Sequence, residues 1–234
     1  MGQESRKPAS LLILSGGVGA RSKHHEPKQF YELAGHPLVA HTIIAAVRIE
    51  EIDEIVINAP EGFEQRTKDL MDHYAGGKDY KVVPAGKTRQ ESSRILSDAA
   101  KNETIILHEA ARPFVTRDMY LELLNNEHDN VGYCYEIPFS MCRIDRDTQK
   151  IKKGVSREKV FNIQLPQKFK RSDLVAAHAK AGEKKSKVYT EDAVMVVKNT
   201  DAEVFSLPGT SRNRKITTQE DFLVAEQIMK KLAE

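Results

Sequence analysis

The stretch from Leu11 to Phe30, LLILSGGVGARSKHHEPKQF, joins an apolar run to a glycine-rich segment. Glycine has no Cβ and tolerates positive φ, so a loop of this kind brings backbone N–H groups against phosphate oxygens. A dinucleotide-binding fingerprint needs a third glycine where this chain has Ser22. Two cations follow instead, Arg21 and Lys28, and they suit a triphosphate whose departing pyrophosphate must be neutralised. The alternative is a surface loop with incidental charges.

A second candidate is Gly86-Lys87-Thr88, which imitates the end of a nucleotide-binding P-loop. Lys81 occupies the place of the first glycine of that motif, so a Walker-type site is excluded. The segment still lies between a predicted strand and a predicted helix. Its backbone amides therefore either face a nucleotide or simply begin the helix.

The sequence HEAARP at 108–113 ends another apolar run, at the carboxyl end of a predicted central strand. Open α/β sheets bind their ligands at such ends. Glu109 can hold a magnesium ion that also bridges phosphates, since magnesium takes one or two protein carboxylates and keeps waters. A plain salt bridge from Glu109 to Arg112 is the alternative. Further on, Asn213 and Lys215 precede the last predicted helix, whose dipole adds to the lysine charge in attracting an anion.

Histidines and cysteines give no metal-site signal. No known ligand spacing fits the histidines in the amino-terminal part of the chain, at His24, His25, His36 and His41. Cys134 and Cys142 lack a C-x-x-C spacing and are too few for a disulfide framework, so we expect two reduced thiols.

Short β-branched or leucine-rich runs alternate with longer helical patterns, which predicts an α/β fold with a Rossmann-like, mainly parallel sheet and helices on both faces. The predicted strands lie at 11–15, 54–58, 80–83, 104–108, 131–137 and 203–206. The predicted helices span 37–49, 62–74, 88–100, 116–125, 172–181 and 190–198, and a last one opens with a Thr-x-x-Glu capping box at Thr217-Thr218-Gln219-Glu220. Residues 138–166 are polar with short β-like pieces at 141–144, 150–155 and 160–163, and we interpret them as a protruding arm.

Length and charge exclude several classes of protein. The 234 residues, with a formal net charge of +2, predict one soluble domain over residues 1–234. Near-neutral charge gives no support to a nucleic-acid partner. No apolar run approaches the ~20 residues that a bilayer requires, and the polar start lacks a secretory signal. We therefore expect no nucleic acid, no membrane and a cytoplasmic location.

Six segments in order resemble the cytidylyltransferases that act on 2-C-methyl-D-erythritol 4-phosphate or ribitol 5-phosphate: LSGGVGARSKHHEPKQF, AGKTRQESS, LHEAARPFV, LPQKF, TEDA and NRKITTQEDF. The resemblance runs from about residue 10 to residue 232. It implies transfer of CMP from CTP to a polyol phosphate, with release of pyrophosphate and with Mg²⁺ as cofactor. It also implies a homodimer in which the 138–166 arm embraces a second subunit.

The implied site has four sets of residues. Nucleotide-binding residues are Leu14, Ser15, Gly16, Gly17, Gly19, Gly86, Arg89 and Ser92. The catalytic cations are Arg21, Lys28 and Lys215, and the metal ligand is Glu109. The acceptor contacts are Arg112, Ser140, Arg157 and Thr190, of which the arm lends Ser140 and Arg157 to the other subunit. Because the nucleophile is already an anionic phosphate oxygen, we expect alignment and charge neutralisation rather than a strong general base.

Three departures from the family pattern bear on the acceptor and the metal. Glu109 replaces the usual Asp, Lys87 replaces an acidic residue, and Leu165 replaces a Thr that contacts the second substrate. Without the hydroxyl group of that Thr, an oxygen of the second substrate would lack a hydrogen-bond donor. Together with the LSGG opening, this favours ribitol 5-phosphate slightly over 2-C-methyl-D-erythritol 4-phosphate. Two alternatives stay open, a CTP-binding homologue without turnover and another nucleotide-sugar or NAD enzyme of α/β fold.

Overall fold

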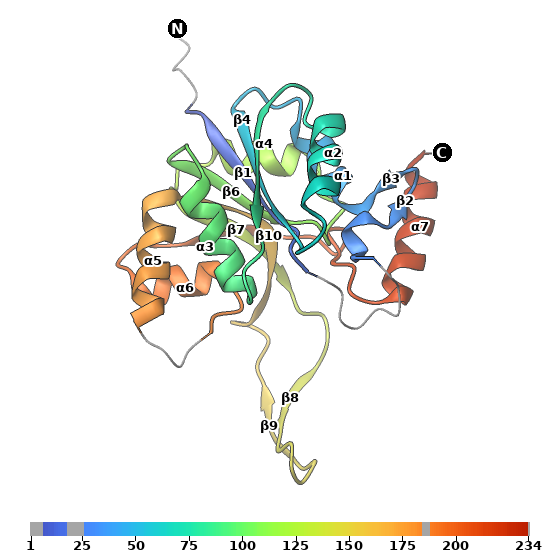
Figure 1. The fold of residues 1–234 in the computed structure, drawn as a ribbon. Coiled ribbons are helices and arrows are strands. Elements are labelled where there is room, and N and C mark those ends of the chain that lie inside the picture. The colour runs from blue at the N-terminus through green and yellow to red at the C-terminus, as the bar shows by residue number, and fades with distance from the viewer. Residues whose placement is uncertain (1–6, 18–25, 184–187, 234) are drawn as a thin grey trace, which may run out of the picture.

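A seven-stranded sheet forms the centre of the protein (Figure 1). The computed structural model describes residues 7–17, 26–183 and 188–233, and their sheet order is β11-β7-β10-β6-β1-β4-β5. The strands are β1 (Ala9–Leu14), β4 (Ile52–Ala59), β5 (Asp79–Pro84), β6 (Thr104–Glu109), β7 (Val131–Glu136), β10 (Phe161–Lys170) and β11 (Phe205–Pro208). Only β10 runs antiparallel to its neighbours, β6 and β7, within this described sheet. The predicted α/β class with a mainly parallel sheet is confirmed.

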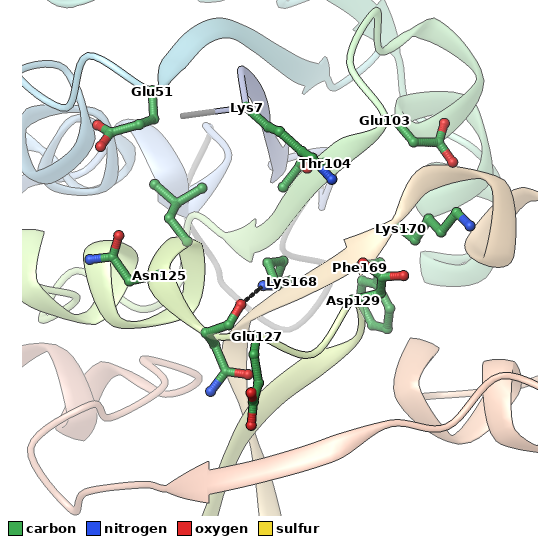
Figure 2. Close-up of a pocket in the computed structure, with 12 residues that line it drawn as sticks. Lys7, Glu51, Glu103, Thr104, Asn125, Glu127, Asp129, Lys168, Phe169 and Lys170 are labelled. Atoms are coloured by element: carbon green, nitrogen blue, oxygen red, sulfur yellow. Dashed lines mark hydrogen bonds between the residues drawn. The ribbon is translucent and has the colours of Figure 1, made fainter. Parts of the chain in front are cut away.

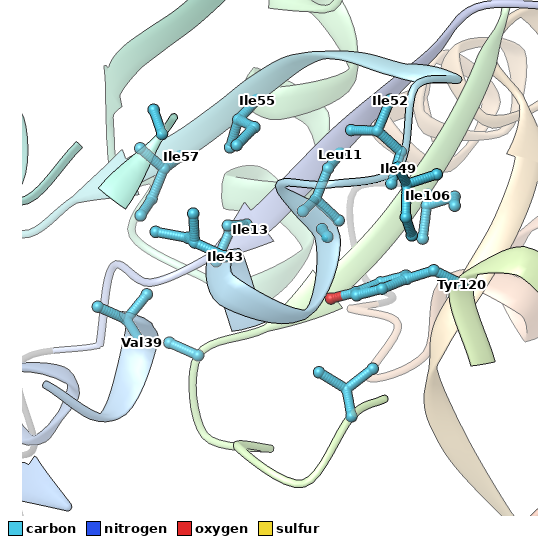
Figure 3. Close-up of a cluster of buried hydrophobic side chains, with 14 of the residues drawn as sticks. Leu11, Ile13, Val39, Ile43, Ile49, Ile52, Ile55, Ile57, Ile106 and Tyr120 are labelled. Carbon is cyan, nitrogen blue, oxygen red and sulfur yellow. The ribbon is translucent and has the colours of Figure 1, made fainter. Parts of the chain in front are cut away.

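Helices cover both faces of the sheet. They are α1 (Leu38–Ala46), α2 (Glu64–Tyr74), α3 (Arg89–Ala99), α4 (Arg117–Asn125), α5 (Arg171–Glu183), α6 (Asp192–Asn199) and α7 (Gln219–Ala233). Because side chains alternate along a strand, Leu11 and Ile13 of β1 pack with α1, α2 and α4 on one face (Figure 3). Leu12 packs with α3, α5 and α6 on the other face. Burial of each such side chain contributes about 1.5–3 kcal/mol.

Threonine caps begin three of the helices. The Thr88 hydroxyl accepts a hydrogen bond from the Glu91 amide at 3.0 Å, and α3 starts there. Thr116 caps α4 in the same way. At α7 the reciprocal pair is Thr218 and Asp221, one residue later than the sequence predicted, so the expected box ending at Glu220 was wrong. Here Asp221 takes the place that Glu or Gln usually has in a capping box.

The polar excursion forms a hairpin that projects from the body of the molecule (Figure 1). Its strands are β8 (Met141–Ile144) and β9 (Ile151–Val155), which pair with each other and not with the main sheet. The last residues of the predicted 138–166 segment belong to β10, which starts at Phe161 and pairs with β7. Proline normally interrupts a central strand, and β10 accommodates Pro166 at a register shift between Gln164 and Gln167. That proline hid the strand in the sequence.

A short segment missed by the sequence prediction leads from the glycine-rich region to α1. It comprises the 3₁₀ turn η1 (Lys28–Phe30) and a two-stranded hairpin, β2 (Glu32–Leu33) and β3 (His36–Pro37). Leu33 packs with Leu38 of α1 and with Ile216 and Ala225 of the carboxyl-terminal region. The segment thereby brings Lys28 next to the loop that precedes α7.

No described helix has both the length and the apolar character that a membrane crossing demands.

Candidate active site

The loops after β1 and β5 touch at the carboxyl edge of the parallel strands. A Cβ added to Gly16 would lie 2.3 Å from the Ala85 Cβ, so only glycine allows this approach. The end of β6 is joined to the same place, because the Ala110 amide donates to the Leu14 carbonyl at 3.1 Å. Leu14, Ser15, Gly16 and Gly17 therefore lie where open α/β sheets bind ligands.

The β5–α3 loop is folded tightly on the start of α3. The Gly86 amide donates to the Ser92 hydroxyl at 3.0 Å, and the Lys87 amide donates to Glu91 Oε2 at 2.8 Å. A Cβ on Gly86 would lie 2.7 Å from the Ser92 amide nitrogen. Of the two readings of this segment, the helix start is the one that accounts for these amides. The loop gives the site a close-packed glycine wall, in which the Gly86 and Lys87 amides are bonded within the loop itself.

Glu109 at the end of β6 is the centre of a charged cluster. It is 6% exposed, and its Oε1 accepts from Arg112 Nε at 2.7 Å. Its Oε2 lies 2.5 Å from the Lys215 ammonium. Burial alone would raise the pKa of Glu109, but Lys215 and Arg112 outweigh it and the pKa is lowered. The carboxylate is therefore ionised at neutral pH and holds two cations at the edge of the sheet.

Backbone carbonyls of residues 213–216 fix the cations around Glu109. Arg112 Nη1 donates to the Asn213 carbonyl at 2.7 Å, and Lys28 Nζ donates to the Ile216 carbonyl at 2.8 Å. The turn that carries Lys28 is itself tied to β1, because Gln29 Nε2 donates to the Ser15 carbonyl at 2.5 Å. Lys28 and Ile216 are 188 residues apart in the sequence. Two distant segments of the chain therefore meet in one site.

Arg89, the first residue of α3, connects the end of the β5–α3 loop to α6. Its Nη1 lies 2.5 Å from Asp192 Oδ2, and its Nη2 lies 4.0 Å from Glu191 Oε2. Burial raises the pKa of Glu191, and that carboxylate also interacts electrostatically with Glu109 and Lys215. Thr190 is exposed just before this acidic pair. The start of α6 therefore forms another wall of the charged cluster.

Most of the predicted site residues share this edge. Those that the structure brings to it are Leu14, Ser15, Gly16, Gly17, Lys28, Gly86, Arg89, Ser92, Glu109, Arg112, Thr190 and Lys215. Gly19 and Arg21 lie outside the described residues. Sequence reasoning gave no role to Glu191 and Asp192, although the TEDA segment that contains them was part of the resemblance.

Ser140 and Arg157 belong to the projecting excursion and are exposed. Arg157 Nη1 donates to the Pro138 carbonyl at 2.9 Å, which ties the two ends of the excursion together. Within the described part of the chain, neither residue forms a hydrogen bond or an ion pair with the Glu109 cluster. One subunit alone does not place them in the site.

A cavity of about 490 Å³ lies at the opposite, amino-terminal edge of the sheet (Figure 2). Both charge signs line it, from Lys7, Lys168 and Lys170 on one hand and from Glu51, Glu103, Glu127 and Asp129 on the other. Lys168 donates to the Asn126 carbonyl at the carboxyl end of α4 at 2.8 Å, which is an ordinary helix cap. The cavity is separate from the glycine loops and the Glu109 cluster, so it is not the candidate site.

The chain matches the model of the IspD family, 2-C-methyl-D-erythritol 4-phosphate cytidylyltransferase, over residues 9–231. It belongs to this family. The enzyme of that name from Clostridium botulinum (strain ATCC 19397 / Type A) is 35% identical over 233 residues, covering 95% of this chain and 98% of the relative. Its namesake from Clostridium acetobutylicum is 33% identical over 230 residues, covering 94% and 96%.

Solved structures agree with the family assignment. The crystal structure of 4-diphosphocytidyl-2C-methyl-D-erythritolsynthase from Anaerococcus prevotii superposes with a TM-score of 0.82 at 26% identity, covering 96% of this chain and 99% of that one. The motif resemblance is thereby confirmed, and the protein is a cytidylyltransferase of the IspD family. The glycine loops and the Glu109 cluster are its candidate active site.

Proposed function

We propose that this family member transfers CMP from CTP to 2-C-methyl-D-erythritol 4-phosphate. An oxygen of the acceptor phosphate attacks the α-phosphorus of CTP and forms a new P–O bond. The bond from the α-phosphorus to its bridging oxygen breaks, and the electron pair leaves with pyrophosphate. The name of the family and of the relatives at 33–35% identity supports this acceptor.

The cation cluster carries the proposal. Lys28 is bonded to the carbonyl of Ile216, the residue after Lys215, and the Lys215 side chain is 41% exposed, so its ammonium can reach a substrate. Transfer of a phosphoryl group demands alignment and neutralisation of charge on the leaving group. Lys28 binds the triphosphate and the leaving pyrophosphate, and Lys215 binds the α-phosphate or the incoming phosphate. Arg21, assigned to the triphosphate from sequence, lies outside the described residues.

Glu109 fits a magnesium ion that arrives with the nucleotide. The described residues contain no cluster of three or more potential metal ligands, and magnesium often uses one or two carboxylates with phosphate oxygens and waters. Glu109 would hold the ion, which would neutralise charge on the phosphates. Glu109 is one methylene longer than the usual Asp, and its carboxylate is held by Arg112 and Lys215. Lys215 can turn to the substrate when the carboxylate accepts the metal.

The structure weakens the sequence argument for ribitol 5-phosphate. Leu165 is 3% exposed and packs in the core with Phe169 and Leu174. An apolar side chain in the core is not a substituted acceptor contact, so the inferred loss of a hydroxyl donor no longer bears on specificity. Arg112 and Thr190 stay our candidates for the acceptor, since they supply a charge for its phosphate and a hydroxyl group for its polyol chain.

We further propose that the protein is one domain that dimerises through its excursion. Phe139 and Ile151 are each 73% exposed and Ile144 is 50% exposed, so the hairpin presents apolar surface to solvent. A second copy would bury this surface and would receive Ser140 and Arg157 at its acceptor site. Sedimentation at micromolar concentration should show a dimer. A fully active monomer would remove this part of the proposal.

The deciding experiment measures pyrophosphate release from CTP and magnesium with each acceptor in turn. We expect kcat/KM for 2-C-methyl-D-erythritol 4-phosphate to exceed that for ribitol 5-phosphate at least tenfold, a difference of about 1.4 kcal/mol in transition-state free energy. A kcat/KM that is higher for ribitol 5-phosphate would overturn the proposed acceptor but not the proposed reaction. CTP binding without release of pyrophosphate from either acceptor would overturn the reaction.

A further inference from the structure

Asp192 links α3, α5 and α6 behind the nucleotide loop. It is 1% exposed, and its Oδ2 lies 2.5 Å from Arg89 Nη1. Its other oxygen, Oδ1, accepts from the Ser93 hydroxyl at 2.7 Å. The carboxylate is thus held from two positions of α3 that lie four residues apart, on the same face of that helix.

His178 of α5 completes the network without supplying charge. Its Nε2 lies 3.3 Å from the Ser93 hydroxyl and 3.8 Å from Asp192 Oδ1. Burial lowers the pKa of His178, so the imidazole is neutral at pH 7. Arg89 is therefore the cation that balances Asp192. A buried ion pair of this kind is weak grounds for stability, because desolvation opposes the attraction, so its presence beside the site calls for another role.

The two terminal nitrogens of Arg89 are paired differently: Nη1 lies against Asp192, whereas Nη2 is only within ion-pair distance of Glu191. Among the described residues, Nη2 makes no hydrogen bond although it is hidden from solvent. The nearest acidic group is Glu191 Oε2 at 4.0 Å, beyond hydrogen-bonding distance. The Glu191 side chain is 36% exposed and can turn toward water. Such a turn would open Nη2 to another acceptor, and buried donors without a partner are rare in proteins.

We infer that Asp192 is a positioning residue, which holds the Arg89 guanidinium at the start of α3 so that Nη2 donates to an oxygen of bound CTP. Fixing Nη1 on Asp192 sets the plane of the guanidinium, and Nη2 then lies on the side of Glu191, the carboxylate that interacts electrostatically with Glu109 and Lys215. This inference rests on the proposed binding of CTP at this edge of the sheet. It does not depend on which polyol phosphate accepts the CMP.

The test is a double-mutant cycle on CTP affinity, measured by calorimetry. The four proteins are the wild type, Asp192→Asn, Arg89→Ala and the double variant. We expect Asp192→Asn to weaken CTP binding at least tenfold in the wild type and less than twofold when Arg89 is already alanine, because the carboxylate acts through Arg89. An equal loss of CTP affinity on Asp192→Asn with and without Arg89 would overturn the inference. Unchanged CTP affinity together with reduced thermal stability would also overturn it.

Two further variants keep the test decisive. Glu54→Gln is the matched control, since Glu54 is equally buried at 1% exposure but lies at the far edge of the sheet, and we expect its CTP affinity to be unchanged. Ser93→Ala keeps the pair of Arg89 and Asp192 and removes one bond; we expect a two- to fourfold loss that vanishes with Arg89→Ala. If Asp192→Asn does not fold, this second cycle decides. Wild-type protein that binds no CTP would remove the proposed function as well, whereas binding without coupling would remove the inference alone.

Discussion

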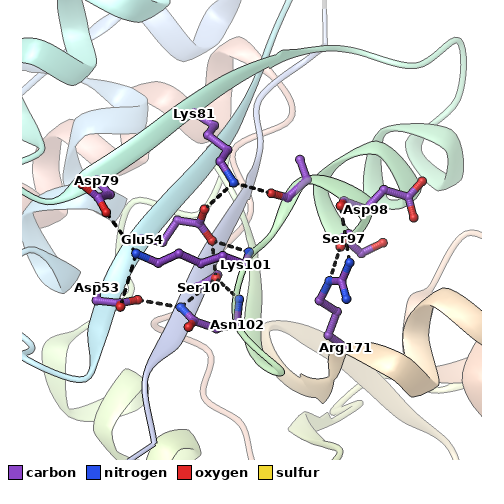
Figure 4. Close-up of polar contacts among 11 residues, drawn as sticks. Ser10, Asp53, Glu54, Asp79, Lys81, Ser97, Asp98, Lys101, Asn102 and Arg171 are labelled. Atoms are coloured by element: carbon purple, nitrogen blue, oxygen red, sulfur yellow. Dashed lines mark hydrogen bonds and ion pairs between the residues drawn. The ribbon is translucent and has the colours of Figure 1, made fainter.

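Two buried glutamates at opposite edges of the sheet each pair with a lysine, yet their surroundings differ. Glu54, 1% exposed, accepts from the Ser10 hydroxyl at 2.5 Å, the Lys101 amide at 2.8 Å and the Lys81 ammonium at 2.8 Å (Figure 4). In the described part of the chain, Glu109 is bonded by long side chains alone, from Arg112 and Lys215.

The difference fits a structural role for Glu54 and the proposed catalytic role of the Glu109 cluster. A backbone amide and a short serine side chain cannot leave Glu54 without unfolding the local structure. Lys215 is held to Glu109 by a long side chain that is 41% exposed, so it is the partner that can turn to a phosphate in the proposed reaction. Glu54 and Glu109 are similarly buried and each is paired with a lysine. What distinguishes them is whether the groups bonded to the carboxylate can move.

The largest effect is expected from Lys215→Ala. Loss of this cation should lower kcat/KM for pyrophosphate release by about 10² to 10³, or roughly 3 to 4 kcal/mol, because it neutralises charge in the transition state. Lys81→Ala is the matched control, a lysine 49% exposed that pairs with Glu54 at the other edge. It should keep full activity. Equal losses of kcat/KM in Lys215→Ala and Lys81→Ala would contradict the placement of the active site at the Lys215 edge of the sheet.

Glu109→Gln should come next. The amide keeps the shape but loses the charge that, in our proposal, holds the metal, so we expect kcat to fall by about 10² and half-maximal rate to require more magnesium. Binding of manganese together with CTP, followed by electron paramagnetic resonance, gives a readout that is independent of turnover. An unchanged manganese affinity would show that the metal is held elsewhere.

Glu54→Gln should change stability instead of catalysis. Hydrogen bonds to the charged oxygens are lost, so we expect the free energy of unfolding to fall by about 1–3 kcal/mol, measured by urea denaturation at pH 7. The hydrogen bonds from Lys101, Lys81 and Ser10 outweigh burial and lower the pKa of Glu54. The stabilisation is therefore complete above the ordinary pKa of a glutamate and is lost as pH falls through the lowered pKa of Glu54. A variant with normal stability but reduced kcat would reverse our reading.

Much of this fold could be predicted from the sequence because its signals are local. Alternating apolar runs gave the strands and both helical layers, and Thr88 and Thr116 marked helix starts that the structure confirms. The continuation of β10 through Pro166 could not be predicted, since a proline inside a strand depends on the register of its neighbours.

The site was predictable in its residue types but not in its partners. The glycine, the cations and the carboxylate of the family's motifs, in their order along the chain, indicated Gly16, Lys28, Glu109 and Lys215. The bond from Lys28 to the Ile216 carbonyl spans 188 residues, so no local pattern contains it. Leu165 shows the reverse failure, because a motif position was assigned to the substrate while its side chain lies in the core.

The smallest predicted effect concerns the start of α7, which follows the Lys215 loop. Burial alone would raise the pKa of Asp221, but hydrogen bonds from Thr217 and Thr218 lower it to about 2. We expect Asp221→Asn to lower the free energy of unfolding by about 0.5–1 kcal/mol at pH 7, the typical size of a weak helix cap. Because the folded pKa lies below the ordinary 3.8, the difference from wild type should shrink as pH falls from about 4 toward 2. Glu220→Gln on the same turn is the control and should change stability less than Asp221→Asn. If the two substitutions cost the same, the cap assigned to Thr218 and Asp221 is wrong and the box ending at Glu220 is restored.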